Sequence, residues 1–589
     1  MDLHFTSAAA TPDERAAVDA ALAPEREGAT GAAARSQRHH LLPLLHAVQE
    51  RIGWISPGAL NYVSERLEVA PAEAYGVATF YALFSTTPRA PSVVHVCDDI
   101  ACMCAGAAAL CGDLESAFGP PGEVYAGRGT TWLRAPCLGL CDRAPAALVT
   151  VAGESPAARQ LAPVDESILS GAMNGAFLDE LASPQIGGSE LRLLRRIGRV
   201  DPESIDAYRA SGGYLALRRA LELGPERTIA EIVASKLLGR GGAAFPTGRK
   251  MEAVARAAGR PHYIICNADE SEPGTFKDRI LMEHDPFAVV EAMTISAYAT
   301  GCERGFIYVR GEYPQAARRL ANAIARAREH GFLGDDVLGR GVRFDVEIRR
   351  GAGAYICGEE TALFNSIEGK RGEPRNKPPF PTEAGLFGKP TLVNNVETLV
   401  NVPQIVLDGG AAYASIGTPD STGTRLFCLS GAIAKPGLYE VPHGTTMGAL
   451  VEMAGGVPSQ HALQAILLGG AAGTFVTSDA LSMRLSFEDA RAAGATLGSG
   501  VVMLFDERVD LMSILHRIAR FFREESCGQC VPCRVGTVRQ EEALQRGDFV
   551  LLDEIGRAMR DASICGLGQT AASVIASAHS LRLVGTEHR

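Results

Sequence analysis

The chain has 589 residues, of which 46% are hydrophobic and 21% charged, and its formal net charge is −11 at pH 7. This length predicts about three to five domains, and the negative charge disfavours nucleic acid as a partner. No run of about 18 apolar residues occurs, and the N-terminus lacks a signal-peptide pattern, so we expect a cytoplasmic protein without a transmembrane helix.

The N-terminal part of the chain predicts an arm followed by two small domains. Residues 1–36 are rich in Ala, Glu and Gly, and they predict a flexible arm with a short helix over 12–22. Residues 37–90 have the apolar spacing of a helical bundle. From 91 to 155, strand-like runs alternate with a helix, which indicates a thioredoxin-like α/β layer.

The rest of the chain divides into a linker and three further regions. Residues 156–200 carry Pro, Ser, Gly and Ala and predict a linker across the surface. The glycine-rich stretches described below fall within 201–420. Strand-like runs indicate a β domain over 421–506, and a helical pattern with cysteines at its turns covers 507–589.

The chain contains fourteen cysteines, and without an export signal they favour metal or redox use over disulfides. Four of them, Cys97, Cys102, Cys137 and Cys141, form two closely spaced pairs that each follow a predicted strand. Both pairs can therefore lie on neighbouring loops, and four thiolates suit a [2Fe–2S] cluster. The alternative is structural zinc, whose cysteine pairs are usually two residues apart.

A second set consists of Cys527, Cys530 and Cys533, with Cys565 further along the chain. Three cysteines at this spacing wrap three corners of a cubane, and a remote cysteine supplies the fourth, so the set predicts a [4Fe–4S] cluster. The remaining cysteines are expected to be buried small residues, although Cys104 could compete with Cys102 as a ligand. These are Cys104, Cys111, Cys266, Cys302, Cys357 and Cys428.

Three stretches combine glycines with polar side chains. The first runs from Gly239 to Lys250, where glycines let backbone N–H groups approach a phosphate and the lysine supplies positive charge. The second covers 267–279 after a strand-like run, and the third covers 350–363. Any one of them could be only a tight turn and a polar loop, but the three together indicate a nucleotide site.

At these motifs the chain, over 201–576, resembles the NADH-binding, FMN-containing flavoprotein subunit of respiratory complex I and its relatives. Those relatives are the diaphorase subunits of NAD-reducing hydrogenases and of NAD-dependent formate dehydrogenases. Cys102, Cys137-Leu-Gly-Leu-Cys141 and Pro145 are similar to the thioredoxin-like ferredoxin subunit of complex I. Ala244 and Met251 depart from the family, which usually has Gly and Trp there.

The resemblance implies a fold and a set of binding residues. It implies a Rossmann-like FMN- and NAD-binding domain in 201–420, a β-grasp (ubiquitin-like) domain in 421–506 and a helical [4Fe–4S] domain at the C-terminus. It implies no catalytic acid or base. FMN would be held by Gly239, Arg240, Gly241, Gly242, Lys250, Asn267, Asp269, Glu270, Gly358, Glu359, Asn394 and Asn395. NAD(H) would be held by Phe245, Glu272, Glu360, Lys377 and Phe380, with the aromatic rings against the adenine.

Electron flow follows from the same resemblance. A nicotinamide delivers two electrons and an iron–sulfur cluster takes one, so a flavin is needed between them. The implied order is NADH, FMN and then the [4Fe–4S] cluster, with the [2Fe–2S] cluster on the other side of the flavin. Glu360 near the ribose would repel a 2′-phosphate, which favours NAD over NADP.

We therefore expect a diaphorase subunit that needs a partner catalytic subunit. Segments 206–214 and 559–569 resemble the β subunit of formate dehydrogenases that contain molybdenum or tungsten, whereas 417–421 resembles the hydrogenase diaphorase. Formate dehydrogenase is the expected partner, and NAD-reducing hydrogenase and complex I are the alternatives. An alternative of another class is a structural or regulatory iron–sulfur protein that senses NADH without turnover.

Overall fold

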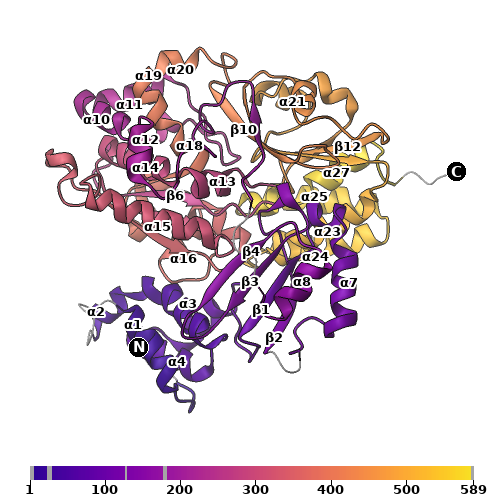
Figure 1. Cartoon of the computed structure of the whole chain (residues 1–589), viewed down its shortest axis with the longest axis horizontal. Helices are drawn as coiled ribbons and strands as arrows, with labels where there is room; N and C mark the ends of the chain where they lie inside the picture. Colours follow the sequence, from indigo (N-terminus) through magenta and orange to yellow (C-terminus); the bar gives the residue numbers. More distant parts are fainter. Residues whose placement is uncertain (1–4, 23–29, 126–128, 177–181, 586–589) are drawn as a thin grey trace.

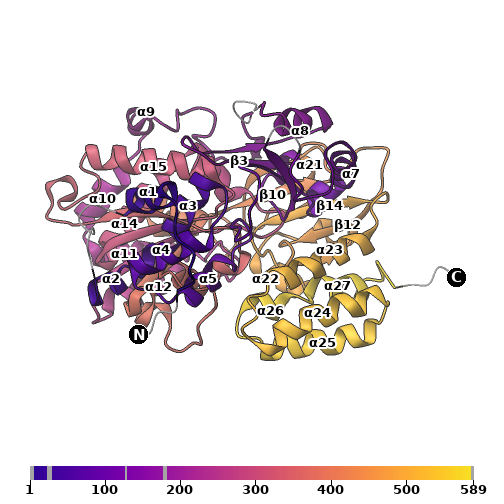
Figure 2. The ribbon, with the colours of Figure 1, turned by 90° about the horizontal axis from the view of Figure 1, so that it is seen from below.

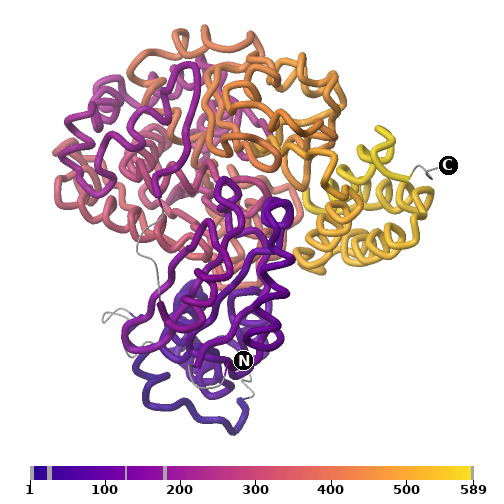
Figure 3. The backbone as a smooth tube through the Cα atoms, turned by 45° about the vertical axis from the view of Figure 1, so that its right-hand side comes forward, coloured from indigo at the N-terminus to yellow at the C-terminus, as the bar shows by residue number. Residues whose placement is uncertain are grey.

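The computed structural model describes residues 5–22, 30–125, 129–176 and 182–585. These residues form three sheets surrounded by helices (Figure 1). The indigo N-terminal part and the yellow C-terminal helices project from a central body on different sides (Figure 3). Residues 1–4 and 23–29 of the predicted arm and 177–181 of the predicted linker lie outside the described residues.

The N-terminal helices form a small bundle. Thr11 caps the first helix with a capping box, and Val18 and Leu22 at its end are buried in the core. The short helix expected over 12–22 is therefore confirmed, but it does not belong to a loose arm, because its apolar side chains pack against the bundle. The helices are α1 (Pro12–Ala21), α2 (Ala32–Ser36), η2 (Arg38–His40), α3 (Leu41–Ile52), α4 (Pro57–Leu67) and α5 (Pro71–Ala78).

The first sheet has the strand order β2-β1-β3-β4, with one parallel pair and two antiparallel pairs. Val94, Trp132 and Val149 on one face pack with residues of α7 and α8. The prediction of a linker from 156 onward is wrong at its start, because β4 and α8 complete this layer. The elements are β1 (Ser92–Cys97), α6 (Ile100–Cys104), α7 (Ala107–Phe118), β2 (Thr130–Ala135), η3 (Cys141–Arg143), β3 (Ala147–Val151), β4 (Ala157–Leu161) and α8 (Glu166–Met173).

The second sheet is fully parallel, with the order β8-β7-β6-β9. Its four strands are β6 (His262–Ala268), β7 (Cys302–Val309), β8 (Asp345–Arg350) and β9 (Thr391–Asn395). Parallel strands bring their carboxyl ends to one edge, and ligands of such sheets bind outside that edge.

Helices cover this sheet, and α14 is apolar on all sides and buried along nearly its whole length. The helices are α9 (Ile205–Ala210), α10 (Leu215–Leu223), α11 (Pro225–Ala234), α12 (Thr247–Arg256), α13 (Lys277–His284), α14 (Pro286–Thr300), α15 (Pro314–Glu329), η4 (Val337–Gly339), η5 (Tyr355–Gly358), α16 (Glu360–Ile367), α17 (Pro381–Ala384), η6 (Leu386–Gly388), α18 (Val396–Val400), α19 (Val402–Asp408) and α20 (Gly410–Ala414).

The third sheet is mixed, with the order β13-β12-β14-β10-β11-β5, and it has its own apolar core. Its edge strand β5 lies inside the predicted linker, so that segment is tied to the sheet by backbone pairing. The elements are β5 (Ile186–Gly188), β10 (Thr424–Gly431), β11 (Gly437–Pro442), α21 (Met447–Met453), β12 (Leu463–Leu468), β13 (Thr474–Val476), η7 (Ser478–Ser482), α22 (Phe487–Ala492) and β14 (Val501–Asp506).

The C-terminal part is helical and lies beside the third sheet (Figure 2). It consists of α23 (Leu511–Glu524), α24 (Val531–Gln545), α25 (Phe549–Ala562), α26 (Gly566–Thr570) and α27 (Ser573–Ser580). None of the helices in the described part of the chain is both long and apolar enough to cross a membrane.

Candidate cofactor-binding site

The loops that follow the parallel strands meet the glycine-rich loop between α11 and α12. A Cβ added at Gly241 would lie 3.2 Å from the Cβ of Asn395, so the two loops approach as closely as a glycine allows. Gly242 has a φ of +113°, which also favours glycine. Asn267, at the end of β6, donates from Nδ2 to the carbonyl of Gly358 over 2.8 Å. Three segments that are distant in sequence thus form one edge.

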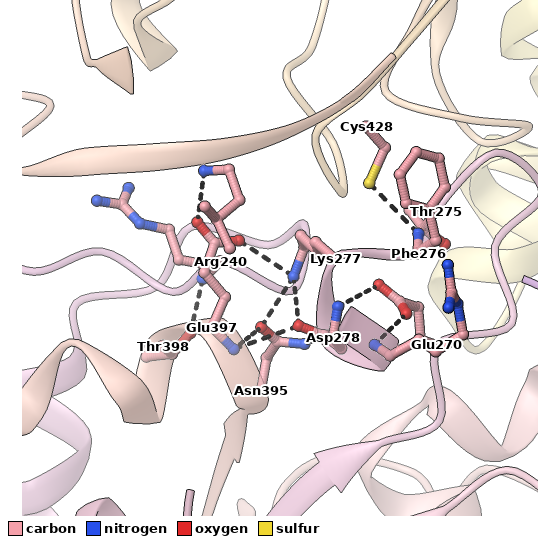
Figure 4. Close-up of polar contacts among 12 residues, drawn as sticks. Arg240, Glu270, Thr275, Phe276, Lys277, Asp278, Asn395, Glu397, Thr398 and Cys428 are labelled. Carbon is pink, nitrogen blue, oxygen red and sulfur yellow. Dashed lines mark hydrogen bonds and ion pairs between the residues drawn. The ribbon is translucent and has the colours of Figure 1, made fainter. Parts of the chain in front are cut away.

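Arg240 links the glycine-rich loop at this edge to neighbouring segments of the protein (Figure 4). Its backbone N–H donates to Thr398 Oγ1 over 2.8 Å, and its fully buried guanidinium contacts the His443 ring over 2.7 Å and the Thr422 carbonyl over 2.8 Å. The Arg240 side chain therefore already has protein partners, and cofactor binding by this residue stays a prediction. The guanidinium fastens the glycine-rich loop to the third sheet.

A buried ion cluster lies next to this loop and was missed from the sequence. Lys277 Nζ contacts Asp278 Oδ1 over 2.8 Å, Glu397 Oε2 over 3.1 Å and Asn395 Oδ1 over 3.2 Å (Figure 4). Asn395 also donates to Asp278 Oδ2 over 2.6 Å. The neighbouring carboxylates raise the pKa of Lys277, although burial opposes this. The lysine therefore stays charged, and both the oxygen and the nitrogen of the Asn395 amide have partners inside the protein.

Glu270 also has a structural role. Its carboxylate accepts hydrogen bonds from the backbone N–H groups of Asp278 and Arg279, both over 2.9 Å, and so caps the start of α13. Burial raises its pKa to about 8. The sequence predicted Glu270 as a cofactor ligand, but both of its carboxylate oxygens already have protein partners.

Two buried polar atoms at this edge have no partner among the described residues. They are Oδ2 of Asp269, which directly follows β6, and Nδ2 of Asn394, which lies at the end of the neighbouring strand β9. Burial raises the pKa of Asp269 well above its usual range. Because buried polar groups are normally hydrogen-bonded, an acceptor and a donor left open here fit a polar ligand such as the ring and ribityl chain of FMN.

The expected NAD(H) residues form the outer part of the site. Lys377 Nζ contacts Glu359 Oε1 over 2.9 Å and Glu360 Oε1 over 2.7 Å. Glu359 also caps α16 through the N–H groups of the first turn. The rings of Phe245 and Phe380 are 48% and 53% exposed, so both are open to a planar ligand.

Lys250 lies beneath this outer part. Its ammonium is 5.9 Å from the centre of the Phe245 ring, and it donates to the Val393 carbonyl over 3.1 Å. Burial lowers its pKa. No described carboxylate pairs with Lys250, so its charge is open to an anionic ligand.

Glu272 connects three regions. Its carboxylate accepts from the Tyr355 hydroxyl over 2.7 Å and from the backbone N–H of Ala472, in the third sheet region, over 2.7 Å. Tyr355 in turn donates its backbone N–H to Glu525 over 2.8 Å. Burial raises the pKa of Glu272 to about 7 and that of Glu525 to about 7. The contact between Glu272 and the β domain could not be read from the sequence.

The cysteines of the first set converge and are buried. Cys137 and Cys141 have their Sγ atoms 3.4 Å apart, Cys97 is the last residue of β1, and Cys102 lies on α6. The loop between Cys137 and Cys141 is held against the domain of the second sheet. Arg310 donates to the Cys137 carbonyl over 2.6 Å, and Arg279 donates to the Gly139 carbonyl over 2.8 Å. Four thiols on two facing loops fit a [2Fe–2S] cluster.

The cysteines of the second set line one small cavity. Cys527, Cys530, Cys533 and Cys565 all face it, together with apolar side chains such as Ile356 and Ile564. Among the described residues, no three His, Cys, Asp or Glu side chains converge closely enough to hold a single metal ion. Four thiols around one apolar cavity fit a cubane.

The other cysteines differ in their surroundings. Five are buried, as expected, and carry no disulfide: Cys111, Cys266, Cys302, Cys357 and Cys428. Cys104 is exposed at the end of α6, so the prediction of its burial is wrong.

Known protein families match four regions of the chain. They are described as "Thioredoxin-like [2Fe-2S] ferredoxin" over residues 29–157, "Nuo51 FMN-binding domain" over 232–404, "SLBB domain" over 426–473 and "NADH-ubiquinone oxidoreductase-F iron-sulfur binding region" over 513–581. An F-type subunit of NADH-quinone oxidoreductase from Rhizobium meliloti (strain 1021) is 47% identical over 390 residues, which is 64% of this chain and 93% of that protein. The chain belongs to the flavoprotein family of respiratory complex I.

Relatives of this flavoprotein also occur in hydrogenases. The NADP-reducing hydrogenase subunit HndC of Solidesulfovibrio fructosivorans is 43% identical over 392 residues, 65% of this chain and 80% of that protein. A chain in the crystal structure of an air-oxidized NAD⁺-reducing [NiFe]-hydrogenase is 34% identical, with a TM-score of 0.80, and the match covers 95% of this chain and 93% of that chain. This flavoprotein is thus an oxidoreductase of the NADH dehydrogenase type, with FMN, [2Fe–2S] and [4Fe–4S] as cofactors and NAD as substrate.

Proposed function

We propose that this flavoprotein passes electrons between NAD(H) and the catalytic subunit of a larger oxidoreductase, and that this subunit is a metal-dependent formate dehydrogenase. The electron-transfer part of this proposal is carried by a hydrogen-bonded connection across the molecule. Glu272, in the loop after β6, contacts Tyr355, and Tyr355 contacts Glu525, which precedes Cys527 by two residues. The nucleotide loops and the [4Fe–4S] cysteines are therefore neighbours.

FMN bound here would supply the chemistry that links two-electron transfer from NADH to single-electron transfer by the clusters. The glycine-rich loop, Lys250, Asp269 and Asn394 hold it at the edge of the parallel sheet. Phe245 and Phe380 clamp the nucleotide outside it, and Lys377 orients Glu360 toward the ribose. The buried contacts of Arg240, Glu270 and Lys277 within the protein position these loops.

The two clusters have different places in this arrangement. The [4Fe–4S] cysteines lie next to the nucleotide loops and close to the surface, since Cys527, Cys530 and Cys565 are partly exposed. The [2Fe–2S] cysteines are buried beneath Arg310 and Arg279. We infer that the electron leaves through the [4Fe–4S] cluster and that the [2Fe–2S] cluster is off this route.

An apolar stripe beside the [4Fe–4S] cysteines supports docking of the partner there. Val531, Val535 and Val538 on α24 lie on one side of the helix and are between 39% and 59% exposed. Ile564, next to Cys565, is also exposed. Exposed apolar patches of this kind mark protein–protein contacts. A partner bound at this patch would lie next to the [4Fe–4S] cluster, from which it receives electrons in this proposal.

The organisation of the chain favours an enzyme in which the thioredoxin-like and flavoprotein regions are fused. The Rhizobium meliloti relative matches 64% of this chain, whereas the hydrogenase chain matches 95%. Segments 206–214 and 559–569 support formate dehydrogenase within this class. The hydrogenase match is the specific observation for the second candidate, an NAD-reducing hydrogenase.

The test is to purify the complex through a tag on this chain, assay NAD⁺ reduction by formate and by H₂, and measure metals. Molybdenum or tungsten with formate activity supports the proposal, and nickel with H₂ activity selects the hydrogenase. Sub-stoichiometric flavin without NADH–ferricyanide activity would instead indicate a sensor or structural protein.

The docking surface can be tested in the same preparation. Val535→Asp should reduce recovery of the partner while NADH–ferricyanide activity is retained. Leu407→Asp, at an exposed apolar position on α19, is the matched control. Equal recovery of the partner in both variants would place the interface elsewhere.

A further inference from the structure

A cavity of about 640 Å³ lies where the N-terminal bundle, the thioredoxin-like sheet and the flavin domain meet. The face of the first sheet that α7 and α8 leave uncovered forms one wall, with Val93 on β1 and Thr150 on β3. The first turns of α15 form the opposite wall, and β4 passes close to α15 (Figure 1). Ligand pockets usually measure about 300–1,000 Å³, so this cavity has the size of a small-molecule site.

The cavity is strongly cationic. Four arginines line it, Arg89, Arg159, Arg318 and Arg350, against one lining carboxylate, Glu50. Glu50 is already paired with Arg350 over 2.6 Å. Four guanidinium groups around one hollow, with a single carboxylate between them, predict an anion, and their planar forks match phosphate oxygens in particular.

Two of these arginines are short of anionic partners. Among the residues that the structure describes, Arg89 donates only to the carbonyls of Gly53 and Leu83, over 2.8 and 3.3 Å, and burial lowers its pKa to about 10. Arg318 has no hydrogen-bond or ion-pair partner in the described part of the chain. A bound anion would therefore replace water around these charges without breaking ion pairs.

The cavity also offers neutral polar contacts and an aromatic wall. Nε2 of His95 and Oε1 of Gln160 are buried, and both atoms lack a hydrogen-bond partner among the described residues. His46 and Phe84 pack edge to face, with ring centres 4.8 Å apart, and both line the cavity. Buried atoms without partners inside a polar cavity indicate a ligand that supplies them.

We propose that this junction is a second small-molecule site that binds a phosphate-bearing ligand of nucleotide size, separate from the FMN and NAD(H) sites. Gln160 connects the site to the loop of the [2Fe–2S] cysteines. Its Nε2 donates to the Leu138 carbonyl over 3.2 Å and to the Glu312 carbonyl over 2.9 Å. Leu138 lies between Cys137 and Cys141. A ligand here would fasten the thioredoxin-like layer to the flavin domain.

The test is isothermal titration of the purified holoprotein with ATP, in the presence of saturating NAD⁺ to occupy the dinucleotide site. Inorganic phosphate and adenosine are titrated in parallel to separate the contributions of the phosphates and the ring. We expect saturable binding of one ATP per chain, weaker binding of phosphate and none of adenosine. Thermal unfolding should shift upward with ATP, since a ligand that binds only the folded state stabilises it.

Two variants locate the site. Arg318→Gln should weaken ATP binding about ten-fold, and Ala158→Phe should abolish it by filling the cavity from β4 without removing charge. Arg326→Gln, an exposed arginine on the same helix, is the control and should bind ATP as the wild type does. If no phosphate compound binds at millimolar concentration, or if Arg318→Gln and Ala158→Phe both bind ATP unchanged, the proposal is wrong.

Discussion

The hydroxyl of Tyr355 donates a hydrogen bond to the carboxylate of Glu272 over 2.7 Å. The same residue gives its backbone N–H to Glu525 over 2.8 Å, and its ring lies 5.1 Å from that of Phe521. Tyr355 therefore joins the loop after β6 to the helix that leads into the [4Fe–4S] cysteines. Its two hydrogen bonds are made by different groups, so they can be removed separately.

Glu272 should make stability depend on pH. Burial raises its pKa from 4.5 to about 7, so between these values the folded protein holds a proton that the unfolded chain releases. The free energy of unfolding contributed by this group therefore falls as the pH rises from 4.5 to 7. Glu272→Gln removes this contribution, so its Tm relative to wild type should be higher at the alkaline end of the window than at the acidic end.

Tyr355→Phe should strengthen the pH dependence that Glu272→Gln removes. The Tyr355 hydroxyl lowers the pKa of Glu272, so its loss lets that pKa rise further. The fall in Tm should then extend to higher pH than in the wild type. Differential scanning calorimetry across the window measures both variants. A pH profile of Tm that is identical in wild type, Glu272→Gln and Tyr355→Phe would show that Glu272 does not titrate here.

Glu360→Gln should weaken discrimination against NADPH. The Glu360 carboxylate near the ribose repels a 2′-phosphate, although the contact with Lys377 over 2.7 Å reduces its effect. We expect the ratio of kcat/KM for NADH to that for NADPH to fall about ten-fold. Glu329→Gln, on the exposed side of α15, is the control. An unchanged ratio would remove Glu360 from the ribose pocket.

The two clusters should respond differently to loss of a ligand. Cys530→Ser should stop electron transfer to the partner subunit while NADH still reduces FMN, whereas Cys137→Ser should leave much of the transfer intact. Iron content checks the variants, since the wild type should carry about six atoms per chain from the two clusters. Equal loss of transfer in both variants, with both folded, would contradict the proposed route, and zinc in place of iron would contradict both cluster assignments.

Arg240→Met should lower the Tm even when flavin is absent. The buried guanidinium contacts His443 and the Thr422 carbonyl, and loss of hydrogen bonds to a charged group costs about 1.5–3 kcal/mol each. Arg249→Met, at an exposed position on α12, is the matched control and should have little effect. If Arg240→Met weakens FMN binding with no change in the Tm of the flavin-free protein, the arginine binds the cofactor directly after all.

Local patterns were readable from the sequence. The cysteine spacings, the glycines of the loop before α12 and the strand that ends at Ala268 depend on residues within a few positions of one another. Ser56 caps α4 and Pro57 is its first residue, so the start of that helix also depends on adjacent residues. Contacts between distant segments were missed: the helix α1 was expected but its packing on the bundle was not, and β5 was assigned to a linker although it pairs with the third sheet.

The sequence by itself determined the family, the cofactors and the cysteine sets, because these are encoded in short motifs. Only the tertiary structure decided which polar side chains remain for a ligand. Arg240 and Glu270 have hydrogen-bond partners within the protein, whereas Asp269 Oδ2 and Asn394 Nδ2 have none in the part of the chain that the structure describes. It also decided that Glu272 meets Ala472, 200 residues away, and that four arginines from separate segments share one cavity. Such contacts depend on how whole elements pack, and no local spacing in the chain records them.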